Sequence, residues 1–414
     1  MTSRVAANVD SSALDGIQIV DCDSHFTEPE DLWSSRVTGK WKDRMPVLKT
    51  VDGLTAWYID GERWASTGGN TIGRGRRKIL GTHVLNPFEM VDPSAYSVAD
   101  RLALMDEMGI HTQVVYPNGV GFASNHIFAI EDAEQRTIVL QTFNDFYADI
   151  QEESGERLLP QALLPVWDMD LTVAEMTRLL DRGIRGFTLS DRPELLGLPE
   201  LNDPYFYPMW DIFNETGAVA NFHISSGKKR EETESSRLGQ SGFVPGRIPE
   251  VAPLAWSSFG RMRNVAVRAA QGYMSNVRII TNLCMSDMFD RFPKLKVVSA
   301  ESGIGWVPFL LEALEYQLDE MITHPEERRL QKRRPTEYFR DHLYVMFWFE
   351  SHGPATAIPV IGAENVLVET DVPHPTCYYP GARDHFAKVL SGLDALTVRR
   401  VLQDNAAELY HIGL

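Results

Sequence analysis

The sequence predicts a single (β/α)8 barrel, the TIM-barrel fold, over residues 1–414, and two observations predict it. Short apolar runs alternate with longer amphipathic segments along most of the chain, and eight such runs occur. This alternation is typical of parallel strands joined by right-handed helical crossovers. Eight units in one α/β domain indicate a closed barrel, and a large doubly wound sheet is the alternative.

The expected strands are the apolar runs, and the segments between them have helical spacing. In 98–109, for example, apolar side chains recur every three or four residues, which is the period of an amphipathic helix. The stretches 131–155 and 171–183 have the same character. The eight runs are 17–20, 112–117, 158–167, 184–190, 218–227, 295–303, 343–350 and 363–375.

Two insertions interrupt the repeat, at 30–95 after the first strand and at 227–275 after the fifth. The first contains a β-hairpin with a tight turn at Asp60 and Gly61. Its residues Trp57, Tyr58 and Trp64 form an apolar surface that a partner should cover, so we expect a homodimer. The second insertion begins with a polar loop and continues as helix and loop.

The composition limits the partners and the compartment of the protein. The formal net charge of −17 disfavours nucleic acid and anionic membranes, although a small anionic substrate remains possible. No apolar run approaches the ~20 residues that span a bilayer, and no secretory signal opens the chain. The three cysteines are far apart and form no disulfide framework, so we expect a cytoplasmic protein.

The predicted strand ends carry acids and imidazoles. Asp23 and His25 follow the first strand, His223 follows the fifth and Asp371 follows the eighth. A barrel enzyme builds its site from residues at the carboxyl ends of its strands. The first and eighth strands are neighbours in a closed barrel and the fifth faces them, so these four side chains should converge on a divalent metal ion. Taken singly, each could instead be a satisfied core histidine or a turn residue.

Further residues follow the other strands. Glu301 follows the sixth and is a candidate acid or base, metal ligand or orienting group. Trp167 and Trp348 could line the mouth or pack against helices. No role is assigned to His83, His111, His126, His324, His342 or His352. The candidate substrate contacts are Tyr116, Trp167, Arg192, Trp348 and His374.

Four stretches resemble the amidohydrolase-related family that includes the aminocarboxymuconate semialdehyde decarboxylases. They are "VDCDSHFTEPEDLW", "NFHISSG", "FPKLKVVSAESGIGWVPFLLEALE" and "NVLVETDVPHP". The resemblance implies a metal-dependent barrel with Asp23, His25, His223 and Asp371 as ligands. The chain departs from many members in having Asp-x-His instead of His-x-His after the first strand. It also has Glu301 where the best-known members have a histidine.

The resemblance implies a metal-dependent non-oxidative decarboxylase, a carbon–carbon lyase, that acts on a small aromatic or unsaturated carboxylic acid. The catalytic residues would be Asp371, Glu301 and His223. The oxygen-rich ligand set allows zinc (Zn2+) or manganese (Mn2+). One alternative is a hydrolase of an amide, ester or lactone that uses metal-activated water, because both reactions can use the same residues. A barrel that binds a small molecule without turnover is the second alternative.

Overall fold

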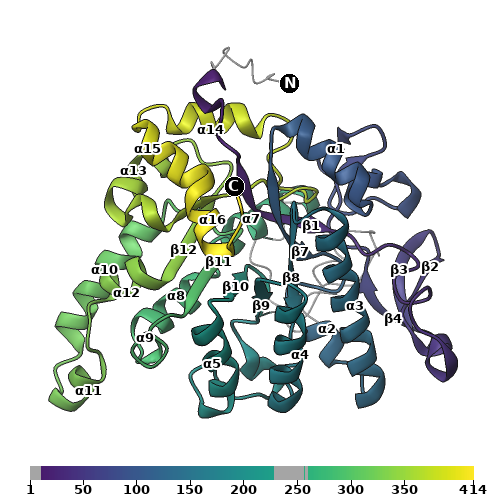
Figure 1. Ribbon diagram of the computed structural model, residues 1–414, viewed down its shortest axis with the longest axis horizontal. Helices are drawn as coiled ribbons and strands as arrows, with labels where there is room; N and C mark the ends of the chain where they lie inside the picture. Colours follow the sequence, from purple (N-terminus) through teal and green to yellow (C-terminus); the bar gives the residue numbers. More distant parts are fainter. Residues whose placement is uncertain (1–10, 228–255, 257–259) are drawn as a thin grey trace.

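The computed structural model describes residues 11–227, 256 and 260–414. Eight parallel strands close into a barrel in the order β1-β13-β12-β11-β10-β9-β8-β7, so the TIM-barrel prediction is confirmed and the doubly wound sheet is excluded (Figure 1). The barrel strands are β1 (Val20–Phe26), β7 (Thr112–Pro117), β8 (Leu158–Leu163), β9 (Gly186–Thr188), β10 (Val219–His223), β11 (Lys296–Ala300), β12 (Leu343–Phe347) and β13 (Val366–Val368).

Helices surround the barrel and separate its strands in the chain (Figure 1). The described α-helices are α1 (Val98–Met108), α2 (Asn125–Phe128), α3 (Ala133–Glu153), α4 (Met169–Asp181), α5 (Tyr207–Thr216), α7 (Arg261–Gly272), α8 (Val277–Cys284), α9 (Met288–Arg291), α10 (Val307–Met321), α11 (Pro325–Leu330), α12 (Pro335–His342), α13 (Gly353–Ile361), α14 (Ala382–Leu390), α15 (Ala395–Arg399) and α16 (Asn405–Tyr410).

Local capping determines where several helices begin and end. The Ser97 side chain accepts a hydrogen bond from the backbone N–H of Asp100 and so caps the start of α1. Gly109 ends the same helix with a φ of 69°, a left-handed conformation that glycine adopts without steric cost. The chain can therefore turn from α1 directly into β7.

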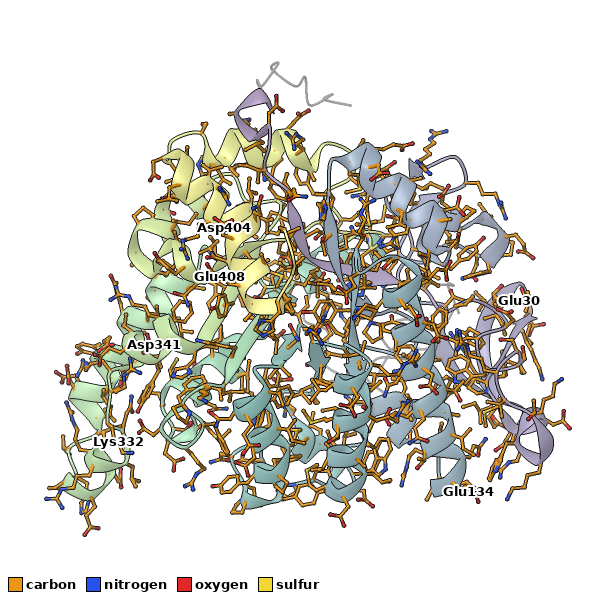
Figure 2. The ribbon with its side chains drawn as sticks, in the orientation of Figure 1. Glu30, Glu134, Lys332, Asp341, Asp404 and Glu408 are labelled. Carbon is orange, nitrogen blue, oxygen red and sulfur yellow. The ribbon has the colours of Figure 1, made fainter. Side chains whose placement is uncertain are left out.

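The apolar core has two layers. One cluster fills the barrel interior with side chains such as Val20, Cys22, Val114 and Val298. A larger cluster packs the outer faces of the strands against the helices. The barrel is therefore a packed core and not a channel, and its mouth is the place for polar chemistry. Charged side chains such as Glu134 and Lys332 project from the outside of the molecule (Figure 2).

A three-stranded antiparallel sheet lies between β1 and β7 in the chain. It consists of β2 (Val47–Val51), β3 (Leu54–Ile59) and β4 (Glu62–Ser66), and a small ribbon of β5 (Ile72–Gly73) and β6 (Arg77–Lys78) follows. Asp60 and Gly61 have φ values of 50° and 88° between β3 and β4, as a two-residue hairpin turn requires.

The hairpin buries two of the three side chains on which the expected homodimer was based, and Tyr58 is partly exposed. Trp57 and Trp64 are buried, with exposed fractions of 0% and 3%. Both rings pack edge-on against Trp33, at centroid distances of 4.9 and 5.8 Å. The hairpin therefore closes over its own chain, because the long segment after β1 supplies a third indole.

Most of the second predicted insertion, residues 228–255 and 257–259, lies outside the described residues. The described part of the chain resumes fully at Gly260 and enters α7. Among the described residues, no helix has both the length and the apolar character needed to cross a bilayer.

Candidate metal centre

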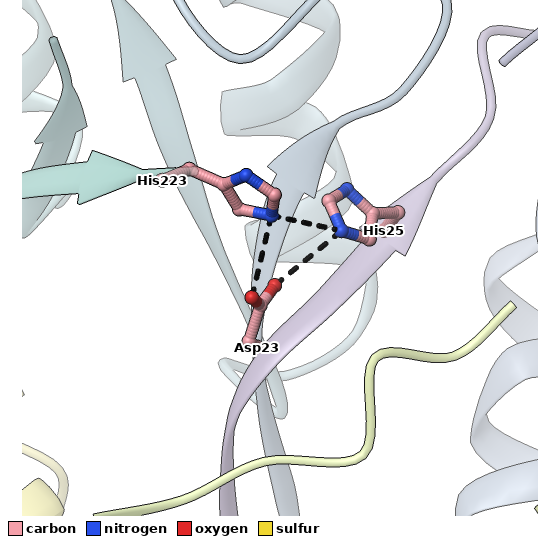
Figure 3. Close-up of side chains that lie close together, drawn as sticks. All are labelled: Asp23, His25 and His223. Carbon is pink, nitrogen blue, oxygen red and sulfur yellow. Dashed lines mark hydrogen bonds and ion pairs between the residues drawn. The ribbon is translucent and has the colours of Figure 1, made fainter. Parts of the chain in front are cut away.

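The four predicted metal ligands meet at the carboxyl end of the barrel. Nε2 of His223 lies 3.3 Å from a carboxylate oxygen of Asp23, and Nε2 of His25 lies 3.5 Å from the other oxygen (Figure 3). A carboxylate oxygen of Asp371 lies 3.4 Å from Nε2 of His25. A cation held at about 2.1 Å by ligands some 90–110° apart needs ligand atoms about 3.0–3.4 Å from one another, so the spacing suits a divalent metal.

A β-bulge makes this convergence possible. In the pairing of β1 with β7, Asp21 is opposite Gln113 but Ser24 is opposite Val115, so three steps along β1 match two along β7. One extra residue reverses the inward–outward alternation. Cys22 and the pair Asp23 and His25 can therefore all face the barrel interior, whereas a regular strand would separate them.

Hydrogen bonds orient both imidazoles for metal binding. Nδ1 of His25 lies 3.0 Å from the Pro117 carbonyl oxygen, and Nδ1 of His223 lies 2.8 Å from the Ile224 carbonyl oxygen. A carbonyl only accepts, so each Nδ1 donates and each Nε2 carries a lone pair. The two Nε2 atoms lie 3.3 Å apart and face each other. A cation between them would remove this lone-pair repulsion.

The carboxylate of Asp23 also has the surroundings of a metal ligand. It is fully buried, and neither oxygen accepts a hydrogen bond from an N–H or hydroxyl group of the described residues. The neighbouring carboxyl of Glu369 can share a proton with it. Burial, and then the charge of Asp371, raises the pKa of Asp23 well above its usual range. Buried acids of this kind are normally paired or bound to a metal, so the residues fit a divalent ion.

Asp371 and Glu301 occupy a strained part of backbone space. Their φ values are 59° and 52°, in the left-handed region that non-glycine residues rarely adopt. Such strain costs of order 1–3 kcal/mol per residue and is concentrated at functional sites. The backbone N–H of Asp371 donates to the Asp23 carbonyl at 2.9 Å, which joins the ends of β13 and β1 at the site.

Glu301 lies beside the ligands and faces the cavity. One carboxylate oxygen is 3.3 Å from Nε2 of His223, and the other accepts a hydrogen bond of 3.3 Å from the Thr376 hydroxyl. Burial, and then the charge of Asp371, raises the pKa of Glu301 well above its usual range. Both effects favour the protonated form of a carboxyl that lines the cavity.

His374 supports the centre from the side of β1. Its Nδ1 lies 2.9 Å from a carboxylate oxygen of Asp371, and its Nε2 lies 3.2 Å from the Asn118 side-chain oxygen. Its ring stacks on that of His25 at a centroid distance of 3.5 Å. His25, Asp371 and His374 form a second group with metal-binding geometry, which shares His25 with the group of Asp23, His25 and His223.

Two buried acids near the centre were not predicted from the sequence. Glu369, at the end of β13, accepts a hydrogen bond of 3.0 Å from the Glu301 backbone N–H. Glu28 accepts the backbone N–H groups of Asn118, Gly119 and Val120 at 3.3, 2.8 and 3.2 Å. Glu369 directly follows the apolar strand β13, and that position was the available signal, whereas the strand before Glu28 is largely polar. Glu28 holds the loop that continues to the cavity wall.

A cavity of about 200 Å³ opens beside the metal centre. A single water needs only ~10–15 Å³ on this measure, so a small organic molecule can enter. Glu301, His374 and Thr376 line the side nearest the centre, and Phe122 and Asn118 line the loop after β7. The ring centroids of Phe122 and His223 are 3.9 Å apart.

Four of the five predicted substrate contacts do not line this cavity, and His374 does. Tyr116 is fully buried and donates its hydroxyl to Asn221, and Trp348 is buried with its indole N–H donating to the Thr376 carbonyl. Trp167 stacks on Phe128. Arg192 forms an ion pair with Glu194. Both tryptophans therefore follow the packing alternative.

The cavity wall includes residues that the sequence did not reveal. His83 and His126, to which no role was assigned, line it together with Phe122. One face of α7 completes the wall through Val265, Arg268, Ala269 and Gly272, together with Tyr273, which caps the end of the helix. These residues come from loops and from a segment far from the strand ends, so no strand-end pattern could identify them.

Comparisons with known proteins match most of the chain. The family model described as Amidohydrolase matches residues 20–412. The gamma-resorcylate decarboxylase of Rhizobium radiobacter is 23% identical over 321 residues, which cover 75% of this chain and 86% of that enzyme.

Solved structures share the fold. An amidohydrolase of Mycobacterium avium subsp. paratuberculosis is 20% identical, with a TM-score of 0.67 over 95% of this chain and 99% of that one. A dihydroxybenzoic acid decarboxylase of Polaromonas sp. JS666, solved with manganese and the inhibitor 2-nitroresorcinol, is 18% identical. Its TM-score is 0.58 over 96% of this chain and 97% of that one.

Proposed function

The chain belongs to the amidohydrolase family, and from this premise we propose that it is a metal-dependent non-oxidative decarboxylase of a small aromatic carboxylic acid. The observation that carries the proposal is the pair of Nε2 atoms of His25 and His223, 3.3 Å apart beside buried carboxylates. This centre adjoins a cavity of single-molecule size. The decarboxylases among the relatives favour this reaction over hydrolysis.

We propose Mn2+ as the bound ion and Zn2+ as the alternative. Asp23, His25, His223 and Asp371 supply two oxygen and two nitrogen ligands, a mixed set that suits either ion. Manganese is present in the Polaromonas structure. When bound, the divalent ion supplies positive charge that orients an anionic substrate and stabilises negative charge on it.

The surrounding residues position the substrate and handle the proton. The aromatic ring of Phe122 offers an apolar face beside His223, against which a planar ring can pack. Glu301 lines the cavity and would supply the proton, because burial raises the pKa of its carboxyl and so favours the protonated form. The Thr376 hydroxyl contacts both Glu301 and Asp371 and keeps the two acids in a fixed relation.

In the proposed decarboxylation step, Glu301 donates the proton that replaces the carboxylate. The ring carbon that bears the carboxylate takes the proton of Glu301. The bond from this carbon to the carboxylate then breaks, its electron pair returns to the ring, and carbon dioxide leaves. The Glu301 carboxylate is reprotonated from water. No oxidant or reductant is needed.

The test is carbon dioxide release by metal-loaded enzyme from a panel of hydroxybenzoates that includes 2,6-dihydroxybenzoate. In deuterated water, the product should carry one deuterium at the vacated ring carbon, as seen by NMR. The Glu301→Gln variant should retain its metal and lose most of the carbon dioxide release and deuterium incorporation. Hydrolysis of esters, amides or lactones without carbon dioxide release from any hydroxybenzoate would contradict the proposal.

We also propose a homodimer and a cytoplasmic location, both of which were predicted from the sequence. The hairpin offers no support for the dimer, but Phe309 and Tyr316 on α10 are 76% and 61% exposed. They are seven residues apart and so share a helix face. Light scattering of the wild type and of a Phe309→Ser, Tyr316→Ser double variant tests whether this face joins two copies.

A further inference from the structure

One face of α7 forms the cavity wall outside the barrel. Its lining residues Val265, Arg268, Ala269, Gly272 and Tyr273 follow the 3-1-3-1 spacing of a single helix face. The helix comes after β10 and shares this cavity with the loop after β7 and with Glu301. The wall opposite the barrel is therefore set by a segment unrelated to the strand ends.

This face of α7 combines small side chains with one positively charged side chain. Ala269 and Gly272 are small, and a Cβ added to Gly272 would meet no atom within 4 Å, so the middle of the face leaves space. Arg268 lies beside this space and is half-buried. Among the described residues that line the cavity, Arg268 is the only lysine or arginine.

Tyr273 connects this face to the centre. Its ring packs edge-on against Trp348 at a centroid distance of 5.1 Å, and its hydroxyl is hydrogen-bonded to Thr376. The Thr376 hydroxyl in turn lies within hydrogen-bond distance of both Asp371 and Glu301. The last residue of the α7 face is therefore anchored to the acids beside the ligands, and Arg268 is held a little more than one helical turn away.

We propose that Arg268 binds a second carboxylate of the substrate, so that the enzyme selects aromatic acids with two carboxylate groups. A guanidinium pairs with a carboxylate through two parallel hydrogen bonds, and a half-buried site strengthens this pairing. The leaving carboxylate would lie at the metal side and the retained one at α7. The inference rests on the proposed function, whose substrate class it narrows.

The test compares two probes that differ in one group. Salicylate and 4-hydroxyisophthalate share a carboxylate next to a hydroxyl, and only the second has another carboxylate. Calorimetry with manganese-loaded wild type should give at least about tenfold tighter binding of 4-hydroxyisophthalate. Arg268→Met should remove this preference and leave salicylate binding within about twofold. Arg263→Met is the matched control, since Arg263 is on the same helix, is exposed and does not line the cavity.

Metal content and circular dichroism of each variant show whether the centre and the fold are retained. Equal binding of the probes by wild type, binding of neither, or an unchanged preference in Arg268→Met would overturn the inference. Carbon dioxide release is measured separately. A preference that depends on Arg268, without carbon dioxide release from any substrate, would contradict the decarboxylase and leave the second-carboxylate site standing.

Discussion

The Nε2 atoms of His25 and His223 face each other at 3.3 Å, while each Nδ1 is bound to a backbone carbonyl. The two rings belong to strands β1 and β10, on opposite sides of the barrel. Neither nitrogen can donate to the other without losing its carbonyl partner. A shared cation is the simplest partner for both lone pairs, with Asp23 and Asp371 balancing its charge.

Metal content should depend on these residues. Protein purified without added metal should contain about one manganese or zinc per chain, and His223→Ala and Asp23→Ala should each lose it. Elemental analysis measures this directly. His352→Ala is the control, because His352 is exposed and lies outside both groups with metal-binding geometry. Equal metal in wild type and both ligand variants would rule out this centre.

Removal of the metal should destabilise the protein. A ligand that binds only the folded state at 100 times its Kd contributes about 2.7 kcal/mol to the free energy of unfolding. The melting temperature should therefore fall after chelation and recover with Mn2+. Asp23→Asn should show no such recovery, because it lacks a ligand. Its metal-free form should be about 1 kcal/mol more stable than metal-free wild type, since a crowded buried acid is gone.

Glu301→Gln should affect the chemical step more than binding. The amide keeps the shape and the contact with Thr376 but cannot supply the proton, and loss of such a group typically lowers kcat by about 10²–10⁴. KM and metal content should change little. Steady-state kinetics and elemental analysis test both. Glu312→Gln, an exposed change on α10, should leave all three quantities unaltered. A rise in KM at unchanged kcat would mean that Glu301 only binds substrate.

The α7 wall should respond to size at Gly272. Gly272→Ala should fold normally and be neutral or slightly stabilising, because a Cβ meets no neighbour and helical glycine costs ~0.5–1 kcal/mol relative to alanine. Gly272→Leu should instead fill the space beside Arg268 and raise KM at least about tenfold. Comparing the KM values of the two variants separates the effect of filling the cavity from the effect of replacing glycine in the helix. Equal KM values for both would place the substrate elsewhere.

The buried Glu28 should make stability depend on pH. Burial raises the pKa of its carboxyl above the ordinary 4.5. The folded state therefore holds this proton more tightly than the unfolded state, and the stability it contributes is lost as pH rises from 4.5 through the folded pKa. Glu28→Gln removes this dependence. Urea unfolding at pH 4.5, 6 and 7.5 should show the variant gaining stability relative to wild type as pH rises, whereas a constant difference would exclude this titration.

Much of the barrel and its centre was predictable from local patterns. Seven of the eight apolar runs contain most or all of a barrel strand, because parallel strands buried on both faces need nearly continuous apolar sequence. The run 17–20 meets β1 only at Val20, so Asp23 and His25 lie within the first strand and not after it. The four predicted ligands meet because carboxyl ends of parallel strands share one rim. The substrate wall was not predictable in this way. Trp167 and Trp348 pack against Phe128 and Tyr273 instead, and such ring contacts depend on distant segments that a strand-end pattern does not show.

The sequence by itself determined that a barrel would form and that acids and imidazoles would gather at its mouth. The tertiary structure decided which of them face inward. A one-residue bulge between Asp21 and Ser24 brings Asp23 and His25 to the inner face with Cys22, which strict alternation would forbid. Burial raises the pKa of the Glu301 carboxyl. The packing of α7 brings Arg268 to the cavity. Such outcomes depend on contacts between distant segments, and a local pattern does not encode these contacts.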